Sequence, residues 1–111
     1  MMVNEQKMDE MMDELGFTDV GNGGELLRDA ARLYSSGAKA LVKEVYPTLA
    51  RIHETSLSAC ERNMRSAIER AWLRGTYENQ MKWFGYTIDP QRGKPTVREF
   101  VARMARVCRA D

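Results

Sequence analysis

Apolar side chains recur every three or four residues along nearly the whole sequence, and this spacing most constrains the fold. It places the apolar groups on one face of an α-helix, whereas a half-buried strand needs strict alternation, which we find in no convincing stretch. At 111 residues the chain has the length of one domain. We therefore predict an all-α fold, a compact bundle of about six helices.

Capping residues, glycines and one proline divide this pattern into separate helices. Asn4 suits an N-cap, and Thr96 with Glu99 three residues later has the spacing of a capping box. Pro47 lacks a backbone N–H and disfavours the α conformation before it, so the helix that contains it should break there. The expected helices cover residues 4–15, 25–36, 39–53, 57–74, 76–84 and 96–108. We expect residues 17–24 to form a flexible corner.

Charge is distributed unevenly along the chain. Residues 1–25 hold seven acidic residues and one basic residue, a net charge of −6, whereas residues 26–111 hold 16 basic and nine acidic residues, a net of +7. We accordingly expect an acidic N-terminal helix or tail at residues 1–14, before a DNA-binding domain at 15–111. A basic body suits an anionic polymer, although a solvated helical surface explains the same charges.

Several classes of protein lack support in this sequence. No uncharged apolar stretch approaches the ~18 residues of a membrane span, and the acidic N-terminus is unlike a signal peptide, so we expect a cytoplasmic protein without a membrane partner. With Cys60, Cys108 and His53 as its only cysteines and histidine, the chain lacks the four ligands of a structural zinc site. We predict no metal, no cofactor and no catalytic residue, hence no enzyme, and two reduced cysteines in the core.

The expected helix at 57–74 has the clearest division into two faces. Its apolar positions form one stripe, and the surface opposite is dense in hydrogen-bonding groups near the N-terminal turns. A short helix around Leu49, a turn, and a second helix with exposed arginines near its start are typical of a helix-turn-helix. In that arrangement the second helix enters the major groove of DNA. The predicted buried stripe comprises Cys60, Met64, Ala67, Ile68, Ala71 and Trp72.

The residue types on the exposed face suit the reading of DNA. Arg62 can donate two parallel hydrogen bonds to guanine O6 and N7, and Glu61 can accept one from a cytosine amino group. Arg65 and the hydroxyls of Ser58 and Ser66 suit phosphates, which fix position without carrying sequence information. The alternative is an ordinary amphipathic helix, on which Glu61 and Arg65 form a surface ion pair worth about 0.3–0.5 kcal/mol.

Four segments, at residues 45–50, 60–75, 84–87 and 94–100, carry a resemblance to a known family. They read VYPTLA, CERNMRSAIERAWLRG, FGYT and KPTVREF. From about Lys43 to Ala102 the chain resembles the DNA-binding effector domain of the sporulation master regulator, the stage zero sporulation protein A family. The resemblance implies six helices around a helix-turn-helix, binding to TGTCGAA-type boxes, a homodimer on tandem boxes, and contact with an RNA polymerase sigma factor.

The resemblance also implies roles for single residues. The family's base-reading pair matches Glu61 and Arg62, and its phosphate-binding residues match Ser58 and Arg65. Ser66 stands at a further phosphate-contacting position, where the family has histidine. The family's polymerase-contacting surface matches Phe84 and Ile88.

The family's full-length regulators begin with a receiver domain, which the 14 residues before Leu15 cannot form. The chain is then either a fragment or an isolated effector domain that lacks a receiver. For an isolated domain, we expect the acidic segment to shield the basic reading face, so that deleting residues 1–14 tightens DNA binding. The alternative function is a helical interaction protein that pairs with a full-length regulator and titrates it off DNA. It would pair through its last helix or through a methionine stripe, Met8, Met11 and Met12.

Overall fold

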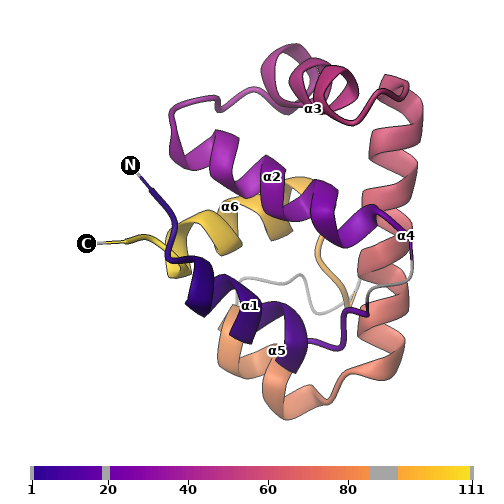
Figure 1. Ribbon diagram of the computed structural model, residues 1–111. Helices are drawn as coiled ribbons and strands as arrows, with labels where there is room; N and C mark the ends of the chain where they lie inside the picture. Colours follow the sequence, from indigo (N-terminus) through magenta and orange to yellow (C-terminus); the bar gives the residue numbers. More distant parts are fainter. Residues whose placement is uncertain (1, 19–20, 86–92, 111) are drawn as a thin grey trace.

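The computed structural model describes residues 2–18, 21–85 and 93–110 (Figure 1). Among these residues it has six α-helices and one π-helical turn, which confirms the prediction of an all-α bundle. Helix α2 contacts both α4 and α6, while α3 lies at the top of the view and α1 and α5 at the bottom. The elements are α1 (Glu5–Glu14), α2 (Gly23–Ser35), η1 (Leu41–Val45), α3 (Tyr46–Ile52), α4 (Leu57–Arg74), α5 (Tyr77–Phe84) and α6 (Val97–Val107).

Side-chain caps fix where most of these helices begin. Asn4 accepts a hydrogen bond from the Lys7 amide at 3.0 Å, as predicted for the first helix. The capping box is also confirmed, because the Thr96 hydroxyl accepts from the Glu99 amide while the Glu99 carboxylate accepts from the Thr96 amide. Each cap satisfies backbone donors that no residue of the helix itself can accept from.

Helix α2 begins two residues earlier than predicted, and part of the expected flexible corner is therefore helical. Gly23 is its first residue and is buried. A Cβ atom there would lie 2.4 Å from the Asn63 carbonyl oxygen and 2.6 Å from the Ala67 Cβ. Only glycine allows the start of α2 to lie this close to α4, so its role is packing rather than flexibility.

The predicted break at Pro47 takes the form of a change of helix type and not of an interruption, because Tyr46 keeps the α conformation, with φ −62° and ψ −44°. The π-helical turn η1 ends at Val45, and the α-helical pattern starts at Tyr46, with Pro47 in the first turn of α3. At that position the missing N–H of proline costs little, because the first amides of a helix have no partner within it. Ile52, the last residue of α3, is 56% exposed.

Apolar side chains from all these elements meet in one core. Phe100 is central to its aromatic part, with ring centroids 5.3 Å from Phe17 and 5.4 Å from Phe84, and Trp72 lies 5.3 Å from Phe84. Cys60 and Cys108 are buried and unpaired, as predicted, and burial raises the pKa of the Cys108 thiol to about 11. Of the helices described, none is long and apolar enough to cross a membrane.

Candidate nucleic-acid interface

A four-residue turn joins α3 to α4 and sets where α4 begins. The amides of Glu54 and Thr55 donate to the carbonyl oxygens of Arg51 and Ala50, at 3.4 and 2.9 Å. Glu54 has a φ of 51°, so the turn is a Schellman motif whose left-handed position holds glutamate instead of the usual glycine. The Ser56 hydroxyl then accepts from the amide of Ala59 at 3.1 Å and caps α4. Helix, turn and helix follow each other as the helix-turn-helix prediction requires.

Helix α4 has the two faces that its sequence predicts. Its buried side chains are Cys60, Met64, Ala67, Ile68 and Ala71, with Trp72 half-buried. The opposite side brings the predicted site residues together at helical spacing: Ser58, Arg62 and Arg65 are exposed, and Glu61 and Ser66 are half-buried. The core contacts of α4 therefore turn these five side chains toward solvent together.

The two predicted arginines differ in their pairing. Arg65 forms an ion pair with Glu61 one turn earlier, and their side chains are 54% and 37% exposed. Arg62 is exposed and has no acidic partner among the residues that the structure describes. Its guanidinium donors are consequently available to a ligand, whereas those of Arg65 are partly occupied in the isolated protein.

One flank of α4 borders a groove of about 370 Å³ shared with η1 and the residues before α6. On its wall, Lys94 donates to the Glu69 carboxylate at 3.0 Å and holds the pKa of that carboxyl below its usual value. Burial raises the pKa of Tyr46, and the nearby charge of Glu61 adds to the effect. The groove on this flank is lined by both acidic and basic side chains, together with apolar ones.

The other flank of α4 faces the turn before α2, and the described residues that line it include no acidic side chain. Arg62, Ser66 and Arg70 line a groove of about 460 Å³ there, with Asn22 and Gly21 on its far side. The side-chain amide of Asn63 donates from Nδ2 to Asn22 Oδ1 at 3.0 Å, which holds the turn before α2 against α4. Arg70 is not among the site residues predicted from the sequence, although its spacing of eight residues from Arg62 places it on the same side of the helix.

A chain of polar and charged side chains joins the end of α3 to α2 and α1. His53, at the end of α3, lies 2.7 Å from the Asp29 carboxylate of α2, and Asp29 also accepts from Arg32 at 2.6 Å. Arg32 in turn donates to Glu5 of α1 at 2.6 Å. The Asp29 partner of His53 lies 24 residues away in the sequence and carries no local signal.

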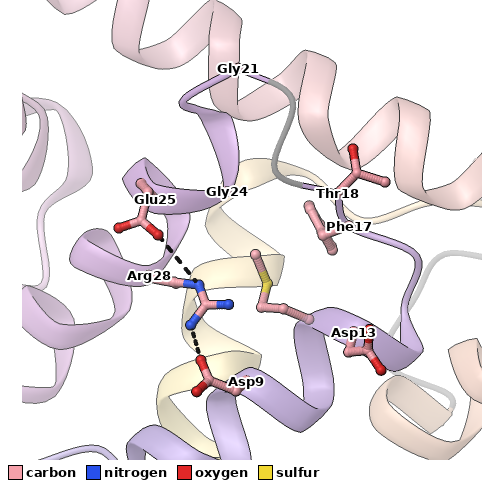
Figure 2. A pocket seen from close by; sticks show the side chains of 9 residues that line it. Asp9, Asp13, Phe17, Thr18, Gly21, Gly24, Glu25 and Arg28 are labelled. Atoms are coloured by element: carbon pink, nitrogen blue, oxygen red, sulfur yellow. Dashed lines mark hydrogen bonds and ion pairs between the residues drawn. The ribbon is translucent and has the colours of Figure 1, made fainter.

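A second polar pocket, of about 370 Å³, lies between α1 and α2 (Figure 2). The guanidinium of Arg28 pairs with the carboxylates of Asp9 and Glu25, and Asp13 adds a third carboxylate to the pocket lining. The excess of negative charge would repel phosphates. The electrostatics therefore favour α4, and not this pocket, as the surface for nucleic acid.

The predicted polymerase contact needs a correction at Phe84. Its side chain is 1% exposed and packs against Trp72 and Phe100, so it offers no surface to a partner protein. Its contact with Phe100 of α6 keeps the Phe84 ring inside the aromatic core. Ile88, the other residue of that prediction, lies outside the described residues.

The comparison with protein families matches almost the whole chain. Residues 8–107 match the family model described as sporulation initiation factor Spo0A C terminal. The match includes most of α1 and all of α2 to α6, together with every predicted site residue on α4.

Proposed function

Because the chain belongs to the family of Spo0A C-terminal domains, which are DNA-binding sporulation effector domains, we propose that it is a sequence-specific regulator of transcription. The observation that carries the proposal is Arg62, an exposed guanidinium without a described partner on the face of α4 that also presents Ser58 and Arg65. An exposed arginine whose donors are available suits guanine, the base that arginine contacts most often in the major groove. The proposal assigns no catalytic step, metal or cofactor.

The proposed mechanism places the first turns of α4 in the major groove. Arg62 donates to O6 and N7 of a guanine, while Ser58, Ser66 and Arg65 contact phosphates and fix the position of the helix. Arg65 must leave Glu61 to reach a phosphate. That exchange releases the Glu61 carboxylate to accept a hydrogen bond from a cytosine amino group, so one rearrangement prepares both contacts.

The family match also guides the choice of operator and partners. We propose TGTCGAA-type boxes in double-stranded DNA as the target, a homodimer on tandem boxes, and an RNA polymerase sigma factor as the further partner of a regulator acting in the cytoplasm. Guanine and cytosine neighbour each other in that box, as the adjacent residues Arg62 and Glu61 require. These contacts define which sequences to test first.

The test compares binding to a TGTCGAA duplex and to a scrambled duplex by fluorescence anisotropy at about 150 mM salt, where non-specific binding is weak, with Kd near 10⁻⁴–10⁻⁶ M. We expect the wild type to prefer the box by about tenfold or more. Arg62→Ala should cost about 1–3 kcal/mol on the box and remove discrimination at the guanine. Equal affinity of the folded wild type for both duplexes contradicts the proposal.

The alternative of a titrating interaction protein loses its main surface. Its methionine stripe, Met8, Met11 and Met12, is at most 2% exposed and lies in the common core. The apolar face of α6 is buried as well. Neither surface is available to a second protein in this fold, and we retain DNA binding as the function.

A further inference from the structure

The groove beside α4 holds one positive charge, that of Arg70, which the contacts described above do not use. Arg62, Ser66 and Arg70 follow each other at intervals of four residues along one side of the helix. Asn22 and Gly21 form the opposite wall, and the hydrogen bond between Asn63 and Asn22 keeps this wall against α4. The groove is therefore fixed by α2 and α4 together.

Arg70 is the unexplained member of this groove. It is exposed, and among the described residues it has neither an ion pair nor a hydrogen-bonded acceptor. Its guanidinium lies over the turn before α2, because a Cβ atom on Gly21 would be 3.9 Å from Arg70 Nη2. The side chain thus extends along the groove, and its donors have no described acceptor.

The position of Arg70 along the helix indicates what its donors meet. At 1.5 Å per residue, the eight residues from Arg62 to Arg70 span about 12 Å along the axis. The major groove is also about 12 Å wide. When Arg62 lies on base edges, a separation of this size is long enough for Arg70 to reach the sugar-phosphate backbone that borders the groove.

We propose that this groove binds a backbone phosphate of the duplex, with Arg70 as its principal donor and the Ser66 hydroxyl and Asn22 side chain beside it. Arginine suits such a site because its planar fork donates two parallel hydrogen bonds to phosphate oxygens. The inference rests on the proposed function and extends it, because the contact is made by α4 together with the start of α2. It adds affinity on every sequence and no base discrimination.

The first experiment measures the salt dependence of binding for the wild type, Arg70→Gln and Arg70→Lys on box and scrambled duplexes. Arg70→Gln should weaken binding to both duplexes by the same factor, about tenfold near 150 mM salt. The slope of log K against log salt should fall by about one unit. Arg70→Lys should keep the wild-type slope, because it keeps the charge.

Arg106→Gln is the matched control, since it removes the same charge from an exposed position on α6, away from α4. It should leave both affinity and slope close to those of the wild type. Circular dichroism must show all variants folded. An Arg70→Gln protein that keeps the wild-type slope, or that changes it no more than Arg106→Gln does, overturns the inference.

A second experiment locates the phosphate. Single methylphosphonate linkages, which lack the negative charge, are placed in turn along the box duplex. One linkage should weaken the wild type and leave Arg70→Gln unaffected, because both changes remove the same contact. If every linkage weakens both proteins equally, the phosphate site is wrong.

The two proposals fail in different ways. A wild type that prefers the box, with Arg70→Gln unchanged, rejects the groove and keeps the regulator. A wild type that binds both duplexes equally, with a reduced slope in Arg70→Gln, rejects sequence-specific reading and keeps the phosphate contact. A folded wild type that binds neither duplex rejects both.

Discussion

Single arginines on the exposed face of α4 differ in whether the protein already neutralises them. Arg65 is paired with Glu61, whereas Arg62 and Arg70 have no described acidic partner. An exposed pair of this kind contributes little to stability, because both groups remain hydrated. In the proposed complex the pair matters more for binding, because a phosphate must compete with Glu61 for the same guanidinium.

Arg65→Ala should therefore weaken binding to all sequences alike and lower the salt slope by about one unit. Urea unfolding should show a loss of less than about 0.5 kcal/mol, the scale of an exposed pair one helical turn apart. Anisotropy on box and scrambled duplexes measures the first effect. A greater loss on the box than on the scrambled duplex would instead assign Arg65 to a base.

At the scale of elements, the turn between α3 and α4 contains the one strained backbone position among the non-glycine residues described. Glu54 adopts a φ of 51°. For an L-residue the left-handed conformation costs about 1–2 kcal/mol, which a Schellman motif normally avoids by using glycine. The hydrogen bonds of Glu54 and Thr55 hold the conformation in place.

Glu54→Gly should stabilise the fold by about 0.5–1 kcal/mol, because the relief of strain exceeds the extra entropy that glycine loses on folding. Urea unfolding measures the change. Glu54→Ala is the control, since it removes the same charge but keeps the Cβ atom, and it should bring no such gain. Equal stabilisation by both substitutions would trace the effect to charge instead of backbone strain.

Elements were predictable wherever their signals are local. The caps at Asn4 and Thr96 and the two faces of α4 each depend on residues a few positions apart, and the structure confirms them. The contacts that position α4 escaped prediction because they join distant segments. Asn22 meets Asn63 across 41 residues, and Gly23 matters only because α4 lies against it.

Across the whole molecule, the acidic helix α1 neutralises cations that lie away from the reading face. Glu5 and Asp9 pair with Arg32 and Arg28 of α2, and Glu14 pairs with Lys82 of α5. The hydrogen bond from Lys82, with a second from Trp83, holds the pKa of Glu14 below its usual value. On α4, by contrast, Arg62 and Arg70 are exposed and have no acidic partner among the described residues.

This arrangement changes what deleting residues 1–14 should do. If α1 were a detachable shield, its loss would tighten DNA binding. Met8 and Met11 are instead fully buried, and removing one such methionine side chain costs about 2–5 kcal/mol, so losing the helix approaches the whole stability of a domain. We expect the truncated chain to lose its cooperative melting transition, measured by circular dichroism, and its preference for the box.

A double substitution separates charge from packing. Glu5→Gln with Asp9→Asn leaves the methionines in place and removes two negative charges that pair with α2. Because those charges are engaged away from α4 and salt screens beyond about 8 Å at physiological ionic strength, box affinity should change less than twofold. A truncated protein that stays folded and binds DNA more tightly, together with a tighter double variant, would restore α1 as an electrostatic shield.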